Sequence, residues 1–260
     1  MAKSVMTKPI DVCGLVLGAG MPKICVPLIG KNESELRVQA AAAKEAGAEL
    51  VEWRADFFEK LEEPERLQAM LQTLTEILGD TPLLFTIRTV EEGGSLAVSP
   101  ENYARINLAA ARSGGAALVD VEIFSGGADK KPLIQSIQEQ GCRVIASSHD
   151  FAKTDAKEQL LERFEQMNRT GADILKMAVM PKTPEDVVTL MQATKEMTTR
   201  TARPLISMSM GKLGEESRVL GEKFGSSLTF ATVEQASAPG QIPIALLRPR
   251  LAACHAELQE

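Results

Sequence analysis

Five apolar stretches of the sequence carry charged or titratable residues near their ends. These are Glu52 and Arg54 in VEWRAD, Thr86 and Arg88 in LLFTIR, Asp120 and Glu122 in LVDVEI, Ser147 and His149 in VIASSHD, and Lys176 in DILKMAV. Side chains alternate between the faces of a strand, so residues two apart point the same way. Chance produces such a placement easily on one strand but not on five in succession. The pattern predicts a site for amine and acid–base chemistry at one end of a sheet.

Lys176 is the strongest candidate for a nucleophile in this set. A lysine within a strand is more often paired with an acid or reaching the surface, and for Lys176 alone we would favour that interpretation. The other polar residues reverse this preference. Apolar neighbours such as Leu175 and Met177, together with nearby arginine and histidine cations, are expected to disfavour the ammonium form. A neutral amine at that position would suit Schiff-base formation.

His149 is the candidate for acid–base catalysis. The chain contains two histidines, and the second, His255, lies in a polar C-terminal segment where a solvated surface role is expected. A histidine titrates near neutral pH, so it can both accept and donate a proton during a reaction. The alternative for His149 is a buried histidine with purely structural hydrogen bonds.

Some of the remaining polar residues also have structural interpretations. The pairs Glu52–Arg54 and Arg88–Glu92, each taken alone, are more often ion pairs without a catalytic role. The two methionines of SMSMG are interpreted as barrel packing. These interpretations stand beside the functional one.

Eight apolar runs alternate with amphipathic segments and predict the elements that position these residues. The expected strands are Lys23–Leu28, Glu49–Arg54, Leu83–Arg88, Ala117–Ile123, Arg143–Ser147, Asp173–Val179, Leu205–Met210 and Ser227–Thr232. Glycine or proline precedes most of them, and Asn32, Ser99 and Thr183 are typical first residues of helices. Near-continuous apolar strands between helices favour a parallel sheet covered by helices.

Eight such units predict an α/β fold, a (β/α)8 TIM barrel, with residues 10–21 as a short N-terminal hairpin closing its bottom. An open doubly wound sheet is the alternative, because the repeat is irregular. The chain has 260 residues, a length at which such barrels occur undivided. Since no linker interrupts the pattern, we expect one catalytic domain over residues 1–260.

Composition excludes several classes of protein. With 44% hydrophobic and 25% charged residues, the chain is globular rather than disordered or repetitive. A net charge of −6 argues against nucleic acid as a partner. Nothing approaches the ~18 apolar residues of a membrane span. The four cysteines lie far apart and none has a histidine nearby, so we expect reduced thiols, no metal site and a cytoplasmic protein.

Six motifs in order resemble one family, the type I 3-dehydroquinate dehydratases. They are VEWRAD, LLFTIRT with EEGG, SSHDF, DILKMAVMP, SMSMG and ASAPGQ, and the resemblance runs from about Pro22 to Gln241. It implies a hydro-lyase of the shikimate pathway that converts 3-dehydroquinate to 3-dehydroshikimate by syn elimination through a lysine Schiff base. It further implies a small-molecule substrate, a homodimer, and no requirement for a metal or cofactor.

Carried over to matching positions, the resemblance assigns roles to nine residues. Lys176 corresponds to the Schiff-base lysine, His149 to the general acid and base, and Glu92 to the glutamate that orients this histidine. The substrate-binding residues correspond to Glu52, Arg54, Arg88, Arg218, Ser237 and Gln241, of which Arg218 is expected to hold the carboxylate and the last two lie on a closing loop. There are two departures: Pro27 replaces a serine found in some members, and Ser148 replaces an asparagine.

Two other functions fit parts of the pattern. A class I aldolase would also use Lys176, but its phosphosugar substrates call for a phosphate site after strands seven and eight. There the sequence offers Arg218 and ASAPGQ, which suit a carboxylate at least as well. A non-catalytic barrel that binds a small acid is the second alternative. Under it, Lys176 would be an ordinary counter-ion.

Overall fold

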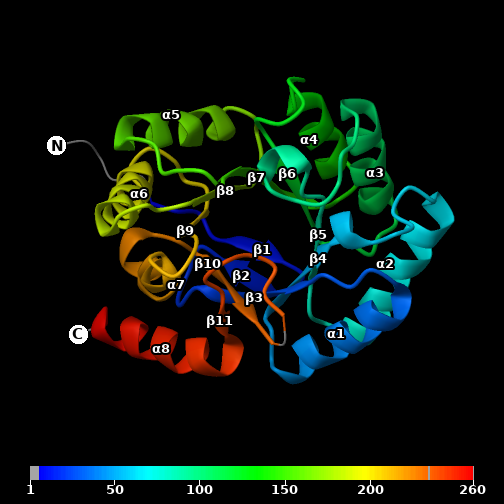
Figure 1. The fold of residues 1–260 in the computed structure, drawn as a ribbon, viewed down its shortest axis with the longest axis horizontal. Coiled ribbons are helices and arrows are strands. Elements are labelled where there is room, and N and C mark those ends of the chain that lie inside the picture. The colour runs from blue at the N-terminus through cyan, green and yellow to red at the C-terminus, as the bar shows by residue number, and fades with distance from the viewer. Residues whose placement is uncertain (1–5, 234, 260) are drawn as a thin grey trace.

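The computed structural model describes residues 6–233 and 235–259, and its central feature is a ring of parallel strands (Figure 1). The eight main strands are β3 (Lys23–Leu28), β4 (Leu50–Arg54), β5 (Leu83–Thr86), β6 (Leu118–Glu122), β7 (Arg143–Asp150), β8 (Ile174–Val179), β9 (Leu205–Ser209) and β10 (Leu228–Thr232). Each pairs in parallel with the next, in the order β10-β3-β4-β5-β6-β7-β8-β9. A bridge between Leu205 and Ser226 joins the two ends. The TIM barrel is therefore confirmed, and the open sheet is excluded.

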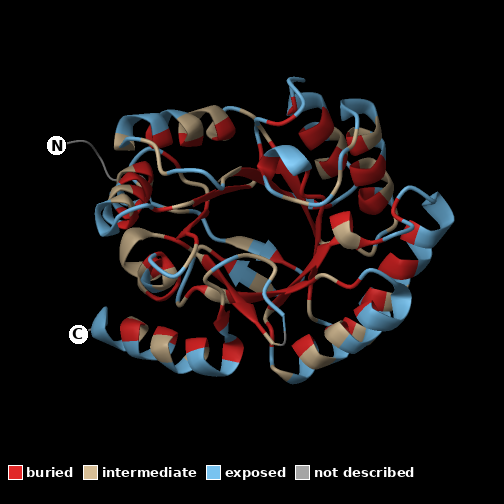
Figure 2. Ribbon diagram, in the orientation of Figure 1, coloured by how far each residue is buried: buried red, intermediate tan, exposed pale blue. Residues whose placement is uncertain are grey.

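Within the described part of the chain, eight α-helices surround this ring. They are α1 (Glu33–Glu45), α2 (Pro64–Leu78), α3 (Pro100–Arg112), α4 (Lys131–Gln138), α5 (Lys157–Asn168), α6 (Pro184–Met197), α7 (Glu215–Leu220) and α8 (Ile244–Glu257). Two of the predicted caps form: the Asn32 side chain accepts from the Glu35 amide at 3.0 Å, and Ser99 accepts from the Asn102 amide at 3.2 Å. Exposed residues cover the outer sides of the helices, whereas buried residues line the strands (Figure 2).

Two strands end more than one residue away from their predicted ends, and one short strand was not predicted. Strand β5 ends at Thr86 because the Arg88 amide donates to Asp56 Oδ1 at 3.2 Å and no longer takes part in the sheet. Strand β7 continues to Asp150, which is paired with Val179 of β8, so His149 lies within a strand. A two-residue strand, β11 (Ile242–Pro243), extends the sheet beside β10.

A hairpin closes the N-terminal end of the barrel, as predicted. It pairs β1 (Ile10–Val12) with β2 (Leu15–Leu17), and Cys13 and Gly14 turn between them at φ 51° and 85°. Two positive φ angles are characteristic of the tight turns that suit hairpins. Val12 and Leu17 are buried against a ring of inward side chains: Cys25, Leu50, Leu84, Leu118, Ile145, Ile174, Ile206 and Leu228. This apolar layer separates the barrel's mouth from its base.

No helix within the described residues has both the length and the apolar character needed to cross a membrane.

Candidate active site

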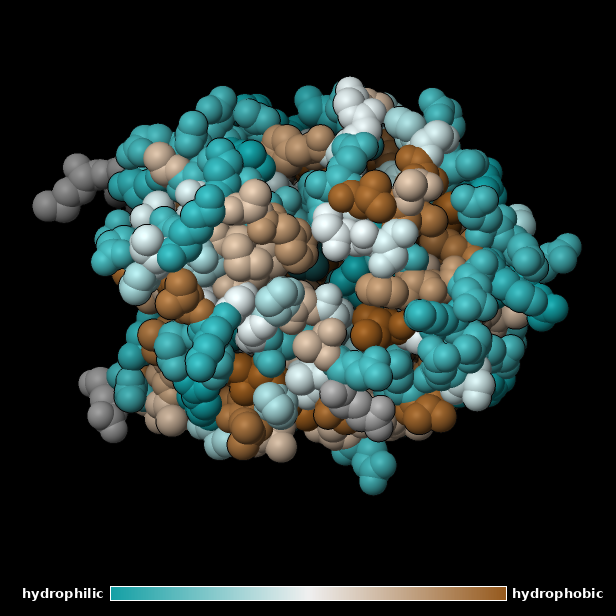
Figure 3. Space-filling model, in the orientation of Figure 1, coloured by the Kyte–Doolittle hydropathy of each residue, from teal (hydrophilic) through white to brown (hydrophobic). Residues whose placement is uncertain are grey.

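A cavity opens above the apolar layer, at the C-terminal end of the strands. It encloses about 440 Å³, and the face of the molecule is hollowed near its centre (Figure 3). Eight of the nine predicted site residues line it: Glu52, Arg54, Arg88, His149, Lys176, Arg218, Ser237 and Gln241. Glu92 lies behind His149 and lines a neighbouring cavity on the other side of the imidazole. One end of the barrel thus gathers all the predicted residues.

Lys176 lies on β8 with its side chain 5% exposed. Its Nζ is 3.4 Å from Asp120 Oδ2 and 3.5 Å from Glu52 Oε1. The amine also lies 4.5 Å from the centroid of the Phe230 ring. The sequence predicted apolar and cationic surroundings. The apolar surroundings are present. The prediction that arginine and histidine cations lie next to the amine is wrong, because the charged groups in contact with Nζ are the carboxylates of Asp120 and Glu52.

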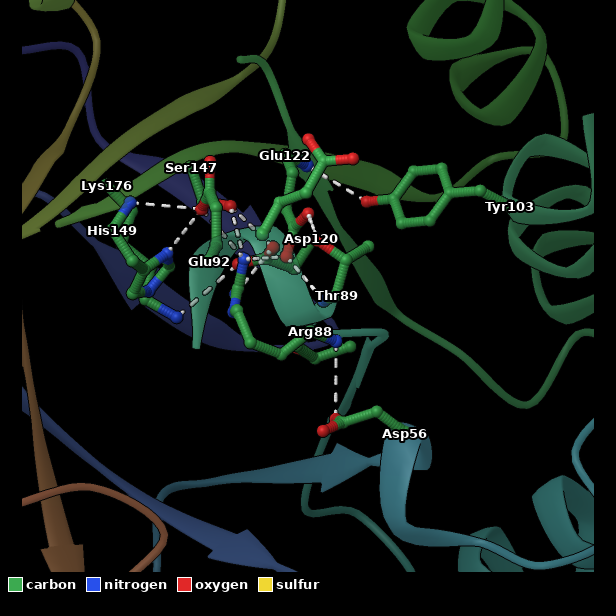
Figure 4. A network of polar contacts seen from close by, with 12 residues as sticks. Asp56, Arg88, Thr89, Glu92, Tyr103, Asp120, Glu122, Ser147, His149 and Lys176 are labelled. Carbon is green, nitrogen blue, oxygen red and sulfur yellow. Dashed lines mark hydrogen bonds and ion pairs between the residues drawn. The ribbon is translucent and has the colours of Figure 1, made fainter. Parts of the chain in front are cut away.

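Arg88 is the centre of a buried ion-pair network (Figure 4). Its guanidinium lies 2.8 Å from Asp120, 2.9 Å from Glu122 and 3.4 Å from Glu92, and it donates to Ser147 Oγ at 3.1 Å. Burial by itself would lower the pKa of Arg88, but the three carboxylates hold that pKa well above its ordinary value. Arg88 is therefore a permanent cation, fixed by strands β6 and β7.

The two acids of β6 are held differently within this network. Burial tends to raise the pKa of Asp120, yet Arg88 and Lys176 outweigh it and hold that pKa below its usual range. Glu122 accepts from the amide and the hydroxyl of Thr89 at 2.8 and 2.7 Å, and the Glu122 amide donates to Tyr103 Oη at 2.9 Å. Asp120 contacts Lys176, whereas Glu122 holds the segment after β5 in place through its hydrogen bonds with Thr89.

His149 and Glu92 form a hydrogen-bonded pair. The imidazole Nδ1 is 2.8 Å from Glu92 Oε2, and the His149 amide donates to the same oxygen at 3.0 Å. Burial, and then the positive charges of Arg88 and Lys176, hold the pKa of His149 well below its usual value. Burial raises the pKa of Glu92 to about 8, because it outweighs the opposing effect of Arg88. The imidazole is neutral at physiological pH, and Nε2 is the nitrogen left for the cavity.

Arg54 also lines the cavity. Arg54 binds the carboxylate of Asp56 with both Nε and Nη2 at 2.8 Å. Its ion-pair partner is therefore Asp56, whereas a pair between Arg54 and Glu52 was considered from the sequence. Asp56 was not predicted, although it stands two residues after Arg54 in VEWRAD.

Arg218 is 2% exposed, and burial lowers its pKa to about 10. Its Nη2 donates to the Pro239 carbonyl at 3.1 Å, and its Nε is without a hydrogen-bond partner among the described residues. A buried guanidinium with a donor left over favours a nearby anion.

The loop that follows β10 covers part of the cavity. The Ser237 amide donates to Gln241 Oε1 at 2.9 Å, and Gln241 Nε2 donates to Ser237 Oγ at 3.1 Å. The loop also contacts the segment after β9, where the Gly211 amide donates to the Pro239 carbonyl at 3.1 Å. At Gly240 a Cβ atom would lie 2.3 Å from the Gly211 carbonyl oxygen. Glycine is therefore required for this close approach.

Several lining residues were not predicted as part of a site. Phe230, Met208, Met210 and Phe151 line the cavity; the two methionines were interpreted mainly as barrel packing and were not assigned a role in the site. Side chains alternate between the two faces of a strand, so Phe230 points the same way as Leu228, two residues before it. This alternation could have predicted that Phe230 faces into the barrel.

The two departures from the family motifs lie apart from the cavity. Pro27 lies on β3 opposite Glu52 but does not line the cavity, and Ser148 is a buried residue whose Oγ accepts from Arg163 at 3.4 Å. Among the described residues, no group of three or more His, Cys, Asp or Glu side chains is arranged to hold a metal ion.

Comparison with known proteins identifies a family. The family model described as type I 3-dehydroquinase matches residues 24–257. A 3-dehydroquinate dehydratase from Listeria monocytogenes serotype 4a (strain HCC23) is 44% identical over 246 residues, which cover 95% of this chain and 98% of that relative.

Solved structures agree with the sequence comparison. A 3-dehydroquinate dehydratase from Geobacillus kaustophilus HTA426 superposes with a TM-score of 0.94 at 40% identity, covering 97% of this chain and 98% of that one. A type I 3-dehydroquinate dehydratase from Clostridium difficile, crystallised with covalently modified comenic acid, superposes with a TM-score of 0.92 at 40% identity, covering 97% and 99%.

Proposed function

The chain belongs to the type I 3-dehydroquinase family of hydro-lyases, and from this premise we propose that it dehydrates 3-dehydroquinate to 3-dehydroshikimate through a Schiff base on Lys176. One observation carries the proposal: an almost fully buried amine lies at the wall of a cavity that also holds a neutral imidazole and a buried guanidinium. These groups supply the nucleophile, the proton carrier and the carboxylate receptor that the reaction needs.

The first step joins Lys176 to the ketone. The nitrogen attacks with its lone pair, so any proton that blocks this lone pair must leave Nζ first. Glu52, whose Oε1 is 3.5 Å from Nζ and which lines the cavity, is the acceptor assigned to it. The bond between Nζ and C3 forms as the carbonyl oxygen takes up protons and departs as water. The product is a cationic iminium, which makes the neighbouring C2 proton far more acidic than in the ketone.

The second step eliminates the C1 hydroxyl. Nε2 of His149 removes a C2 proton, and the electron pair moves through the C2–C3 bond to the nitrogen, giving a neutral enamine. The enamine then expels the hydroxyl from C1, which leaves as water after taking the proton back from His149. Hydrolysis of the conjugated iminium releases the product and restores the amine. One histidine on one face accounts for syn elimination.

Glu92 suits His149 for both roles. When Glu92 is ionised and the proton of the pair lies on Nδ1, the imidazole presents an unprotonated Nε2 and acts as a base; because the pKa of Glu92 is raised to about 8, this form becomes more populated as pH rises towards that value. Once Nε2 has accepted the C2 proton, the adjacent carboxylate stabilises the imidazolium until it acts as an acid. The 2.8 Å contact between Nδ1 and Oε2 fixes the ring for both events.

The arginines and the loop orient the substrate. Arg218 lines the cavity and is assigned to the substrate carboxylate, for which a guanidinium is a matched donor. Arg54, Arg88 and Glu52 face the same cavity and are assigned to the ring hydroxyls. Ser237 and Gln241 lie on the covering loop, whose closure would keep bulk water from the iminium.

Borohydride trapping tests the proposal directly. The protein is incubated with 3-dehydroquinate, the conjugated enone absorbance is followed, and sodium borohydride is then added to reduce any imine. We expect the absorbance to rise and the peptide containing Lys176 to carry the reduced adduct. An adduct-free Lys176 in a protein that forms the enone would refute the covalent role. The covalently modified comenic acid in the Clostridium difficile relative supports covalent chemistry in this family.

Three further expectations stay predictions, the first from the family resemblance and the other two from the sequence pattern. They are a homodimer, a location in the cytoplasm and one catalytic domain over residues 1–260. Gel filtration with light scattering would measure the first.

A further inference from the structure

Asp120 is a buried acid next to the reactive amine to which neither the family motifs nor the mechanism above gives a role of its own. Its side chain is 0% exposed, and its Oδ2 lies 3.4 Å from Lys176 Nζ. It does not line the cavity, whereas Glu52, the other carboxylate in contact with Nζ, does. Any effect of Asp120 on the reaction must therefore act through another residue.

The second oxygen of Asp120 is anchored. Oδ1 accepts from Arg88 Nη2 at 2.8 Å and from Ser147 Oγ at 2.6 Å, leaving Oδ2 for the amine. Glu52 has one such anchor, the Thr86 hydroxyl at 3.0 Å on Oε1. The two acids thus differ: Asp120 is held on strand β6 by a cation and a hydroxyl (Figure 4), whereas Glu52 lines the cavity and is open to a ligand there.

Nζ keeps at least one N–H bond through most of the proposed cycle. The ammonium carries three, and the iminium retains one together with a full positive charge. A fixed carboxylate at 3.4 Å can accept that N–H in both species. It also opposes the escape of the amine from the face of the cavity, because moving Nζ away would leave the buried acid without this partner.

We propose that Asp120 is the fixed counter-ion of Lys176: anchored by Arg88 and Ser147, it positions the amine for attack and then accepts the N–H of the iminium. This inference rests on the proposed function. Asp120 is a positioning residue rather than a catalytic one, because it touches neither substrate nor reacting carbon. Glu52 is left free for the substrate.

The groups that can influence the amine come from five strands. They are Cys25 of β3, Glu52 of β4, Asp120 of β6 and His149 of β7, and the Phe230 ring of β10 covers another side. Burial raises the pKa of Cys25 well above its usual value, so it stays an uncharged thiol. Asp120 is therefore the negative charge whose removal changes the amine without altering the cavity wall.

Replacing Asp120 by asparagine tests this role, since Asp120→Asn keeps the shape and removes the charge. We expect kcat to fall about tenfold to a hundredfold, as for a misplaced catalytic group, with KM changed less than about threefold. Timed borohydride trapping across a pH series gives a second measurement. Because an adjacent anion favours the ammonium form, the midpoint of imine formation should move about one pH unit or more towards acid in the variant.

Glu122→Gln is the matched control. Glu122 is also fully buried on β6 and bound to Arg88, at 2.9 Å, but it has no contact with Nζ. Its variant removes a charge from the same network, and its trapping midpoint should stay with the wild type whatever its turnover. A Glu122→Gln midpoint shifted as far as that of Asp120→Asn would overturn the inference, as would an Asp120→Asn protein with wild-type kcat and midpoint.

Ser147→Ala separates position from charge. It removes the 2.6 Å anchor of Oδ1 and leaves the charge of Asp120, so we expect a smaller loss of kcat, unchanged KM and no shift in midpoint. If Asp120→Asn fails to fold, Ser147→Ala becomes the test of the inference. A wild-type kcat in Ser147→Ala would then contradict the positioning role of Asp120. The proposed function fails separately, through absence of a trapped adduct on the wild-type protein.

Discussion

The two ends of the barrel are built by the same strands and differ in chemistry. Near the base, the inward positions hold side chains such as Leu50, Leu118 and Ile174, which pack against the hairpin. Two residues further along the same strands, the inward positions hold Glu52, Asp120 and Lys176. One repeat of the strand pleat separates a dry apolar layer from a charged cavity.

This arrangement divides stability from catalysis. Apolar burial contributes the larger favourable share of folding free energy and does not depend on the direction of any one contact. Buried charges contribute little net stability even when paired, but removing one partner is costly. We therefore expect changes at the mouth to act on turnover, with a cost in stability wherever a buried charge loses its partner, and changes at the base to act on the free energy of unfolding alone.

The largest expected effect is that of Lys176→Ala on turnover. Without the amine, no imine forms, and kcat should fall by at least about 10⁴-fold, the order of loss seen when a covalent nucleophile is removed. The protein should remain folded and still bind the acid. Steady-state kinetics and isothermal titration calorimetry measure these two properties.

Lys176→Arg is the matched control for that variant. It keeps a cation beside Asp120 and Glu52 but has no nucleophilic amine, so it should be as inactive as the alanine variant. Near-normal turnover in either protein would refute covalent catalysis and reduce the mouth to an electrostatic site.

His149→Ala should break the cycle at a later step. Imine formation continues at a reduced rate, because the amine remains, but elimination lacks its acid and base, so kcat should fall about 10²- to 10⁴-fold. Mass spectrometry of the intact protein should then detect an accumulated adduct. His255→Ala, at the other histidine in the C-terminal helix α8, should behave as the wild type. Continued catalysis with no detectable adduct would contradict the role assigned to His149.

At the base, Leu17→Ala should reduce stability and leave kcat unchanged. Leu17 is 1% exposed within the apolar layer, and such a truncation costs about 2–5 kcal/mol in the free energy of unfolding. For a chain of this size that corresponds to a fall of roughly 4–20 °C in Tm. Val16→Ala, at the exposed neighbour in the same strand, should change stability by less than about 0.5 kcal/mol. A loss of kcat in Leu17→Ala as large as that of a variant at the mouth would contradict the separation of stability from catalysis between the two ends.

Much of this comparison was predictable from the sequence, because both layers follow from one period of two residues. The eight strands, the hairpin and the common end of Glu52, His149 and Lys176 all come from that alternation and from the glycines and prolines between elements. What alternation does not encode is which partners meet across the barrel. The contact of Lys176 with Asp120 joins strands β6 and β8, and it depends on the register and curvature of the closed sheet.

The irregular segments were also beyond pattern reasoning. Asp56 binds the amide of Arg88 and the guanidinium of Arg54, and these long-range contacts end β5 earlier than its apolar run suggests. Likewise, the length of β7 is set by its pairing with β8 rather than by its own composition. Motif resemblance supplied the roles of Glu92 and Arg218, which periodicity alone leaves unassigned.

The smallest effect concerns the pH dependence of stability at the mouth. The pKa of Glu92 is raised to about 8 in the folded protein, with burial as the main cause, whereas an unfolded chain restores its ordinary value near 4.5. A group with a raised folded pKa contributes its full stability below the unfolded pKa and loses it as pH rises through the folded one. Between pH 5 and 8 the wild-type protein should therefore lose stability on account of this carboxyl.

Glu92→Gln removes that titration and should flatten this limb of the stability profile. The difference in unfolding free energy between variant and wild type should drift in favour of glutamine with rising pH, by at most about 1.4 kcal/mol for each pH unit. Urea unfolding at pH 5, 6, 7 and 8 measures the slope. His149 gives the opposite sign, since its folded pKa is lowered mainly by burial and its contribution is lost as pH falls below its ordinary value. A pH-independent difference for Glu92→Gln would mean that Arg88 keeps this carboxylate ionised throughout, and that the mouth holds its charges as firmly as the base holds its apolar layer.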